Sequence, residues 1–270
     1  MRGHFDHDGL RLHYLDSGAG LPFVFQHGLG GDVDQPAGLF RPPPGVRLLA
    51  CDSRGHGNSP VGIPERIGFD VFADDVCSLL DWLEIEQAVV GGVSMGAGVA
   101  LNLAVRHPER VKGLVMSRPA WLGQPLPDHL KVYLRIADLI HLNGPDRGLA
   151  LFRASDELKT IAAESPDSAA SLVKQFEHPR AEEAVTRLYR IPADVPYADL
   201  QAVAALDTPT LVLGNRRDPI HPFTYAEELS RLIPGATFAE LTPKSVDTEK
   251  HSEDTQRCLD SFFRERILTC

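Results

Sequence analysis

The chain has 270 residues, of which 43% are hydrophobic and 24% are charged, and its formal net charge is −10. This length and composition fit one globular domain with an insertion, and they exclude a disordered low-complexity chain. The acidic balance argues against nucleic acid and anionic membrane surfaces as partners, and no apolar run approaches the ~18 residues of a membrane span.

Targeting and redox signals are sparse. The N-terminal segment MRGHFDHDGL lacks the apolar core of a secretory signal, and the four cysteines show no CxxC spacing. Both observations predict a cytoplasmic location with reduced thiols. They leave the oligomeric state open, so a homo-oligomer stays an alternative to a monomer.

Short apolar runs alternate with longer periodic segments, which is typical of a mostly parallel sheet with crossover helices. Several runs are apolar at successive positions, as expected for strands covered on both faces. We expect strands over 10–15, 22–26, 47–51, 88–93, 113–116, 210–213 and 237–241. The intervening periodicity predicts helices over 70–83, 95–106, 223–233 and 252–266.

The alternation stops in the middle of the chain. Residues 122–206 keep a helical periodicity but contain no convincing strand; Gly123, Pro125 and Pro127 mark one end of this stretch, and Pro192 and Pro196 mark the other. We therefore expect an α/β core formed by residues 1–121 and 207–270, with a helical cap inserted at 122–206.

A serine at the end of an apolar run is the strongest chemical signal. Ser94 is the centre of Gly92-Val93-Ser94-Met95-Gly96, which follows the run AVVGGV and precedes a helix rich in small residues. This strand–turn–helix context predicts a nucleophile elbow, whose flanking glycines leave the serine uncrowded and whose helix favours negative charge at its N-terminus.

Acyl transfer also requires two N–H donors for the developing oxyanion. One donor is expected from the residue after the nucleophile, Met95. The other is expected from Leu29, in the glycine-rich segment QHGLGG that follows the apolar run PFVFQ. A plain turn at the end of a strand is the alternative interpretation of that segment.

The set HGLGG, CDSRGHGNS and GVSMG, in this order and spacing, resembles the α/β-hydrolase fold family. The resemblance implies a mostly parallel central sheet with helices on both faces and a helical cap. It is strongest to prokaryotic ester, lactone and carbon–carbon bond hydrolases. In such relatives the loop that holds Asp52, Arg54 and His56 is mostly structural.

The family order places an acid and then a histidine after the serine. Asp218 fits the acid, because its loop resembles the family's Gly-x-x-Asp-x-x-x-Pro pattern; Asp207 precedes the strand and fits less well. The other position that relatives use, after the sixth strand, has no carboxylate. His251 is expected to be the base, although relatives usually have Gly-His there, and His221 is the competing candidate.

These residues predict a serine hydrolase that cleaves a carboxylic ester or lactone of small-molecule size through an acyl-enzyme at Ser94. The alternatives are a carbon–carbon bond hydrolase of a meta-cleavage-type diketone and a non-hydrolytic member such as an acyltransferase, a perhydrolase or a ligand receptor. Nothing in the sequence calls for a cofactor or a metal: His4 and His7 fit a solvated N-terminal segment better than a ligand set.

Overall fold

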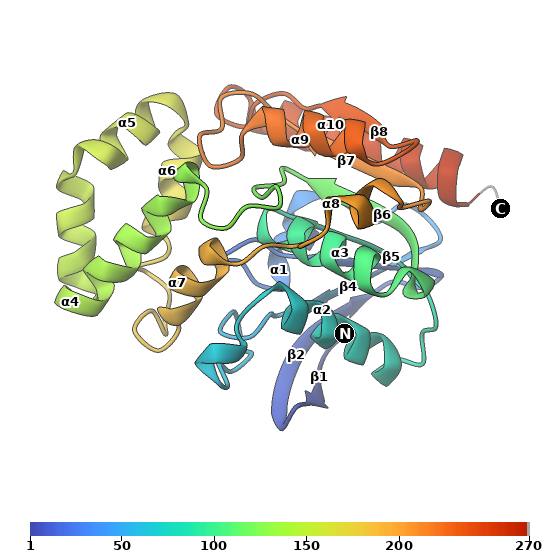
Figure 1. Ribbon diagram of the computed structural model, residues 1–270, viewed down its shortest axis with the longest axis horizontal. Coiled ribbons are helices and arrows are strands. Elements are labelled where there is room, and N and C mark those ends of the chain that lie inside the picture. Colours follow the sequence, from blue (N-terminus) through green and yellow to red (C-terminus); the bar gives the residue numbers. More distant parts are fainter. Residues whose placement is uncertain (269–270) are drawn as a thin grey trace.

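The computed structural model describes residues 1–268 and contains an eight-stranded sheet in the order β1-β2-β4-β3-β5-β6-β7-β8 (Figure 1). β2 pairs antiparallel with β1 and with β4, and all the other pairings are parallel. The strands are β1 Arg2–His7, β2 Leu10–Ser17, β3 Leu21–Gln26, β4 Val46–Cys51, β5 Ala88–Val93, β6 Val111–Ser117, β7 Thr210–Gly214 and β8 Thr237–Glu240.

Helices connect the strands. The helices of the core are α1 Asp34–Leu39, α2 Phe69–Trp82, α3 Met95–Arg106, α9 Phe223–Leu232 and α10 Thr248–Phe262. A π-helical turn, Phe263–Ile267, continues α10. Within residues 1–268, none of the helices combines the length and hydropathy needed to cross a bilayer.

Successive residues of the central strands pack against opposite layers. Val90 on β5 joins the apolar core beneath α2, α3 and α9, whereas its neighbour Val89 joins the core beneath α10. Met116 and Val115 on β6 divide in the same way. Because side chains of a strand alternate between faces, this explains why the central runs are apolar at every position. The expected sheet with helices on both faces is confirmed.

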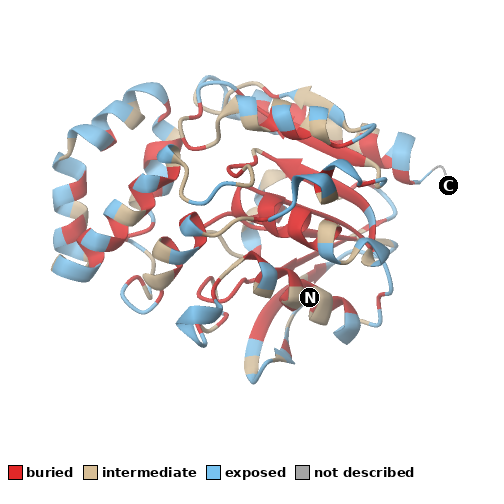
Figure 2. Ribbon diagram, viewed as in Figure 1, coloured by how far each residue is buried: buried red, intermediate tan, exposed pale blue. Residues whose placement is uncertain are grey.

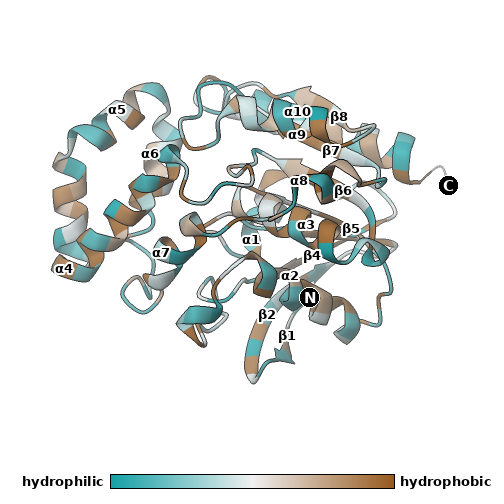
Figure 3. Ribbon diagram, viewed as in Figure 1, coloured by the Kyte–Doolittle hydropathy of each residue, from teal (hydrophilic) through white to brown (hydrophobic). Residues whose placement is uncertain are grey.

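Only helices lie between β6 and β7. They are α4 Lys131–Ala154, α5 Asp156–Glu164, α6 Pro166–Val173, α7 Thr186–Ala193 and α8 Leu200–Ala204, and a short 3-10 turn, Asp128–Leu130, precedes α4. α4 and α5 project away from the sheet and present exposed outer faces (Figure 2). Hydropathy follows burial, since α5 is largely hydrophilic while the strands and α3 are hydrophobic (Figure 3). This segment matches the expected helical cap in content, and its boundaries as a separate unit stay a prediction.

Two elements differ from expectation at the chain ends. β1 was expected as a solvated segment that contains His4 and His7, yet it forms a hairpin with β2 through Asp8 and Gly9, both of which have positive φ. The Asp-Gly pair is a strong hairpin signal. At the other end α10 begins at Thr248 rather than at residue 252, because the Asp247 side chain caps it.

The thiols expected to be reduced are free where the structure describes them. Cys51, Cys77 and Cys258 form no disulfide, and Cys51 is buried. The fourth cysteine, Cys270, lies outside the described residues.

Candidate active site

Ser94 forms the sharp turn between β5 and α3. Its φ of 56° and ψ of −114° are strained for a side chain other than glycine, and its amide donates to the Ser117 carbonyl at the end of β6, at 3.0 Å. The residue is 8% exposed. The N-terminus of α3 directly follows it, so negative charge that develops at Oγ lies in a favourable field.

The flanking glycines are required by close backbone contact. A Cβ on Gly92 would lie 2.2 Å from the Gly96 carbonyl carbon, and a Cβ on Gly96 would lie 2.2 Å from the Gln26 carbonyl oxygen. Both separations are far below van der Waals contact. The elbow therefore brings the first turn of α3 directly against the end of β3.

The end of β3 leads into the predicted oxyanion loop. A Cβ on Gly28 would lie 3.5 Å from Ser94 Cβ, so the loop and the serine are in contact. Gln35 accepts a hydrogen bond from the Gly28 amide at 2.7 Å, and Gln175 of the cap donates to the Leu29 carbonyl at 3.1 Å. These two bonds fix the backbone of the loop at Gly28 and at Leu29.

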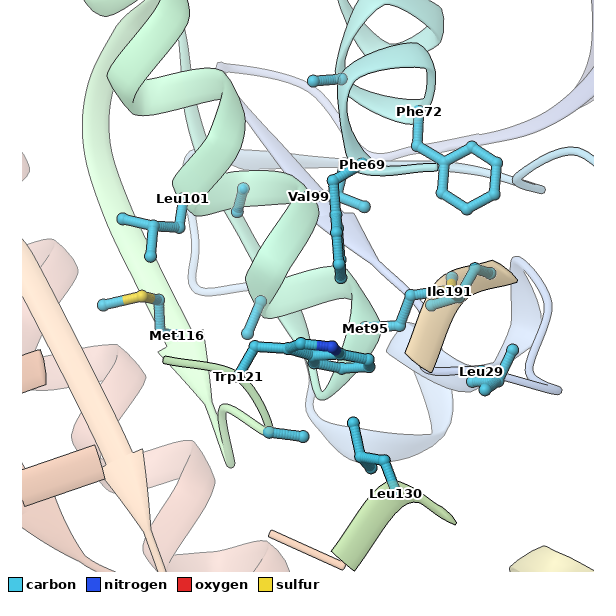
Figure 4. Close-up of a cluster of buried hydrophobic side chains, with 14 of the residues drawn as sticks. Leu29, Phe69, Phe72, Met95, Val99, Leu101, Met116, Trp121, Leu130 and Ile191 are labelled. Carbon is cyan, nitrogen blue, oxygen red and sulfur yellow. The ribbon is translucent and has the colours of Figure 1, made fainter. Parts of the chain in front are cut away.

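The amides of Leu29 and Met95 make no hydrogen bond within residues 1–268. Unsatisfied N–H groups in a buried region are rare, and a pair beside a strained serine can receive an oxyanion. In Figure 4 the side chains of Leu29, Met95, Trp121, Leu130 and Ile191 belong to one cluster of buried hydrophobic residues, so the side chains of both donor residues pack in the core.

Asp218 lies on the loop after β7, and its side chain is buried. Oδ2 accepts a hydrogen bond from Arg118 Nη1 at 3.3 Å and lies 2.8 Å from His221 Nδ1. Oδ1 accepts from Ser168 Oγ of the cap and from the amides of Ile220 and His221, each at 3.2 Å. Burial alone would raise the pKa of Asp218, but His221 and Arg118 outweigh it and hold that pKa well below its usual range. The residue is therefore an ionised, fully bonded carboxylate.

The two candidate bases occupy different surroundings. His221 pairs with Asp218 and, like Leu29, lines a cavity of about 650 Å³. His251 lies in the first turn of α10, is 4% exposed, and its Nδ1 donates to the Thr242 carbonyl at 2.8 Å. Burial lowers the pKa of His251, and the charges of Arg118 and Lys244 lower it further. The expected hydrogen bond between Asp218 and His251 is not formed; Asp218 is paired with His221 instead.

The loop that holds Asp52 and Arg54 has a structural role, as the resemblance implied. Asp52 accepts hydrogen bonds from the Val33 and Asn58 amides at 2.7 and 2.8 Å. Arg54 is ion-paired with Asp75 at 2.7 Å, and both side chains are almost completely buried. The pairs tie this loop to the elements on either side of it.

Three polar groups at the site were not predicted from the sequence. Arg118 directly follows β6, where the sequence offers no carboxylate, and its side chain binds Asp218 from a backbone with a φ of 48°. Ser168 and Tyr133 come from cap helices, and both line the cavity that His221 lines. The only local signal for either was helical periodicity, which carries no information about what a residue contacts across the domain.

The comparisons with known proteins agree with this architecture. The alpha/beta hydrolase fold family matches residues 22–244. A 2-hydroxymuconate semialdehyde hydrolase of Pseudomonas sp. (strain CF600) is 33% identical over 225 residues, which cover 79% of this chain and 76% of the relative.

Solved structures of the same fold superpose over nearly the whole chain. The enol-lactonase from Burkholderia xenovorans LB400 has a TM-score of 0.76 at 22% identity and covers 97% of this chain and 100% of its own. A thermophilic esterase from Thermogutta terrifontis has a TM-score of 0.71 at 24% identity, with 97% and 99% covered. With the family match over residues 22–244 and the 33% identical relative, these likenesses lead to one conclusion: the chain belongs to the α/β-hydrolase fold family.

Proposed function

We propose that the protein is a serine hydrolase that cleaves a carboxylic ester or lactone through an acyl-enzyme at Ser94. The observation that carries the proposal is the strained serine beside two unbonded amides, those of Leu29 and Met95. This arrangement supports attack by Oγ on a carbonyl carbon, with the oxyanion held by both N–H groups.

In the proposed mechanism a base accepts the Ser94 proton as the Oγ–carbon bond forms. The base then returns that proton to the leaving alkoxide as its bond to the acyl carbon breaks. Water repeats the attack on the acyl-enzyme, releases the carboxylic acid and restores the serine. No cofactor or metal takes part in this mechanism.

We assign Asp218 as the acid that orients the base. His221 is our choice of base on the strength of its 2.8 Å contact with Asp218, and it replaces His251, the choice from sequence. His251 is the competing assignment, and it requires α10 to release the bond to the Thr242 carbonyl before the ring can turn toward the acid.

A fluorophosphonate probe and p-nitrophenyl acetate test the proposal. We expect one probe adduct on the native chain, at Ser94, and no adduct or turnover after Ser94→Ala, while the circular dichroism spectrum stays the same. Unchanged ester turnover in Ser94→Ala would exclude the mechanism. Absence of an adduct on the native chain would favour a ligand receptor.

Carbon–carbon bond hydrolysis is the second candidate, because the 33% identical relative is a 2-hydroxymuconate semialdehyde hydrolase. A panel of p-nitrophenyl esters, lactones and dienoate ring-cleavage products separates the two reactions. We expect the highest kcat/KM on an ester or lactone, and a preference of at least tenfold for a ring-cleavage product would reverse the assignment. Faster product formation on addition of an alcohol or thiol acceptor would indicate an acyltransferase.

A further inference from the structure

Helix α6 of the cap and the residues just beyond it bond to two different parts of the proposed site. Ser168, in the first turn of α6, donates to Asp218 Oδ1 at 3.2 Å. Gln175, two residues after the end of the helix, donates to the Leu29 carbonyl at 3.1 Å. Both side chains line the cavity that His221 lines. One short segment of the cap therefore contacts both the acid and the oxyanion loop.

The first turn of α6 fixes the place of the Ser168 hydroxyl. Ser165 is the N-cap of the helix, Pro166 follows it, and Ser165 Oγ accepts from the Ser168 amide at 3.4 Å. Ser168 is 5% exposed, and its Oγ lies 2.9 Å from Ser165 Oγ. A hydroxyl has one proton and a carboxylate only accepts, so Ser168 gives its proton to Asp218 and is an acceptor toward Ser165. The hydrogen bond therefore runs from the cap to the acid.

The remaining partners of Asp218 belong to the core. Oδ1 accepts from the amides of Ile220 and His221, each at 3.2 Å, which is the long end of the usual range. These amides lie on the same loop as the acid. Arg118 and the His221 ring contact the other oxygen, Oδ2. Within residues 1–268, Ser168 is thus the one donor to Oδ1 that comes from outside the loop of the acid itself.

We propose that Ser168 is a positioning residue, through which α6 sets the orientation of the acid. Its bond keeps Oδ1 turned toward the cap, so that Oδ2 faces His221 Nδ1 at 2.8 Å. A hydrogen bond to an ionised carboxylate is stronger than one between neutral groups. Because Gln175 holds the Leu29 carbonyl from the same segment, the acid and the oxyanion loop are aligned together while α6 is docked on the core. This inference rests on the proposed function, in which Asp218 orients the base.

Turnover of p-nitrophenyl acetate by serine variants tests the role of Ser168. We expect Ser168→Ala to lower kcat by about 5- to 30-fold with KM within about twofold, because the acid acts through the base in the transition state. Ser168→Thr keeps the hydroxyl, so its kcat should stay within about threefold of wild type. An unchanged kcat in Ser168→Ala, or a Ser168→Thr variant as slow as Ser168→Ala, would overturn the proposal.

Ser155→Ala is the matched control for a change that only weakens the cap. The Ser155 hydroxyl donates to the Phe152 carbonyl at 2.7 Å and accepts from the Leu158 amide at 3.2 Å, and both partners lie in the cap. We expect this variant to lose stability as an N-cap variant does while its kcat stays within about twofold of wild type. A loss of kcat equal to that of Ser168→Ala would show that any damage to the cap slows the reaction, and it would overturn the specific role of Ser168.

A double variant tests whether α6 aligns the acid and the oxyanion loop together. Losses from independent, distant sites multiply in kcat/KM, whereas sites that depend on one docked helix are coupled. We expect Ser168→Ala combined with Gln175→Leu to lose less in kcat/KM than the product of the two single losses. A loss equal to that product would overturn the joint alignment by α6.

Hydrogen exchange of the loop after β7 needs no turnover and separates this proposal from the proposed function. We expect the Ile220 and His221 amides to exchange at least about threefold faster in Ser168→Ala than in the wild-type protein, and at an unchanged rate in Ser155→Ala. This result with no ester hydrolysis by the wild-type protein would refute the proposed function and keep Ser168 as the residue that positions Asp218. Unchanged exchange in Ser168→Ala would overturn the positioning role even if hydrolysis is confirmed. If Ser168→Ala does not fold, Ser168→Cys takes its place, since a thiol keeps the approximate size but donates weakly, and the same outcomes decide.

Discussion

The assignment of the base can be tested by replacing each histidine with glutamine, which keeps the approximate size and removes the titratable group. His221 contacts Asp218 at 2.8 Å, whereas His251 donates to the Thr242 carbonyl. If His221 is the base, His221→Gln should lower kcat on p-nitrophenyl acetate by about 10²- to 10⁴-fold, which corresponds to roughly 2.7–5.4 kcal/mol in the activation free energy. KM should change little, because the base acts in the transition state.

His251→Gln should behave differently. Its main expected effect is the loss of one buried hydrogen bond at the start of α10, which costs about 0.5–1.5 kcal/mol in the free energy of unfolding, measured by urea denaturation. Its kcat should stay within about threefold of wild type. The reverse pattern, with a kcat loss of 10²-fold or more in His251→Gln and near-normal turnover in His221→Gln, would refute the reasoning from the Asp218 contacts. Large losses in both variants would show that α10 rearranges during turnover.

Three further predictions concern the surroundings of the nucleophile. Because the pKa of Asp218 is held low in the folded state, the stability from its ionised form is present above its unfolded pKa of about 3.9 and is lost as pH falls through the folded pKa. The Tm difference between wild type and Asp218→Asn should therefore be largest near neutral pH and narrow in acid; a constant difference would contradict the assigned charge. Gly96→Ala should lower the free energy of unfolding by about 1–3 kcal/mol in urea, since its Cβ would lie 2.2 Å from the Gln26 carbonyl oxygen. Gln175→Leu should lower kcat/KM by up to about tenfold and the free energy of unfolding by about 1–3 kcal/mol, because it leaves the buried Leu29 carbonyl without its donor; an unchanged rate would mean that this bond does not position the oxyanion loop.

The parts of the site that could be predicted from sequence are those encoded within a few consecutive residues. The elbow needs a buried strand, two glycines around Ser94 and a helix of small residues, and all of them lie between Ala88 and Arg106. β5 and α3 have the predicted bounds, whereas the other predicted strands differ from the prediction by one or two residues at one or both ends. β5 is buried on both faces, and an unbroken apolar run in the sequence is the direct sign of such a strand.

The parts that could not be predicted depend on which segments meet in space. The spacing of Asp218 and His221 is itself a local signal, since Asp side chains often accept from backbone amides two or three residues on, as here. The family's chain order places the base between the last strand and the last helix, and for that reason His251 was preferred to His221. The side chain of Asp247 caps α10, so that the helix begins about one turn earlier than predicted and includes His251.

The acid Asp218 and the proposed base His221 lie on one loop, and this loop must be aligned with Ser94. Both residues belong to the loop after β7, so their alignment with Ser94 depends on the hydrogen bonds between the ends of β5, β6 and β7 and not on α10. Two hydrogen bonds join these strand ends: the Ser94 amide donates to the Ser117 carbonyl at 3.0 Å, and the Arg118 amide donates to the Leu213 carbonyl at 2.7 Å. Arg118 then reaches Asp218 with its side chain. The end of β6 thus contacts both residues: Ser117 bonds to the nucleophile, and Arg118, whose backbone has a strained positive φ, bonds to the acid.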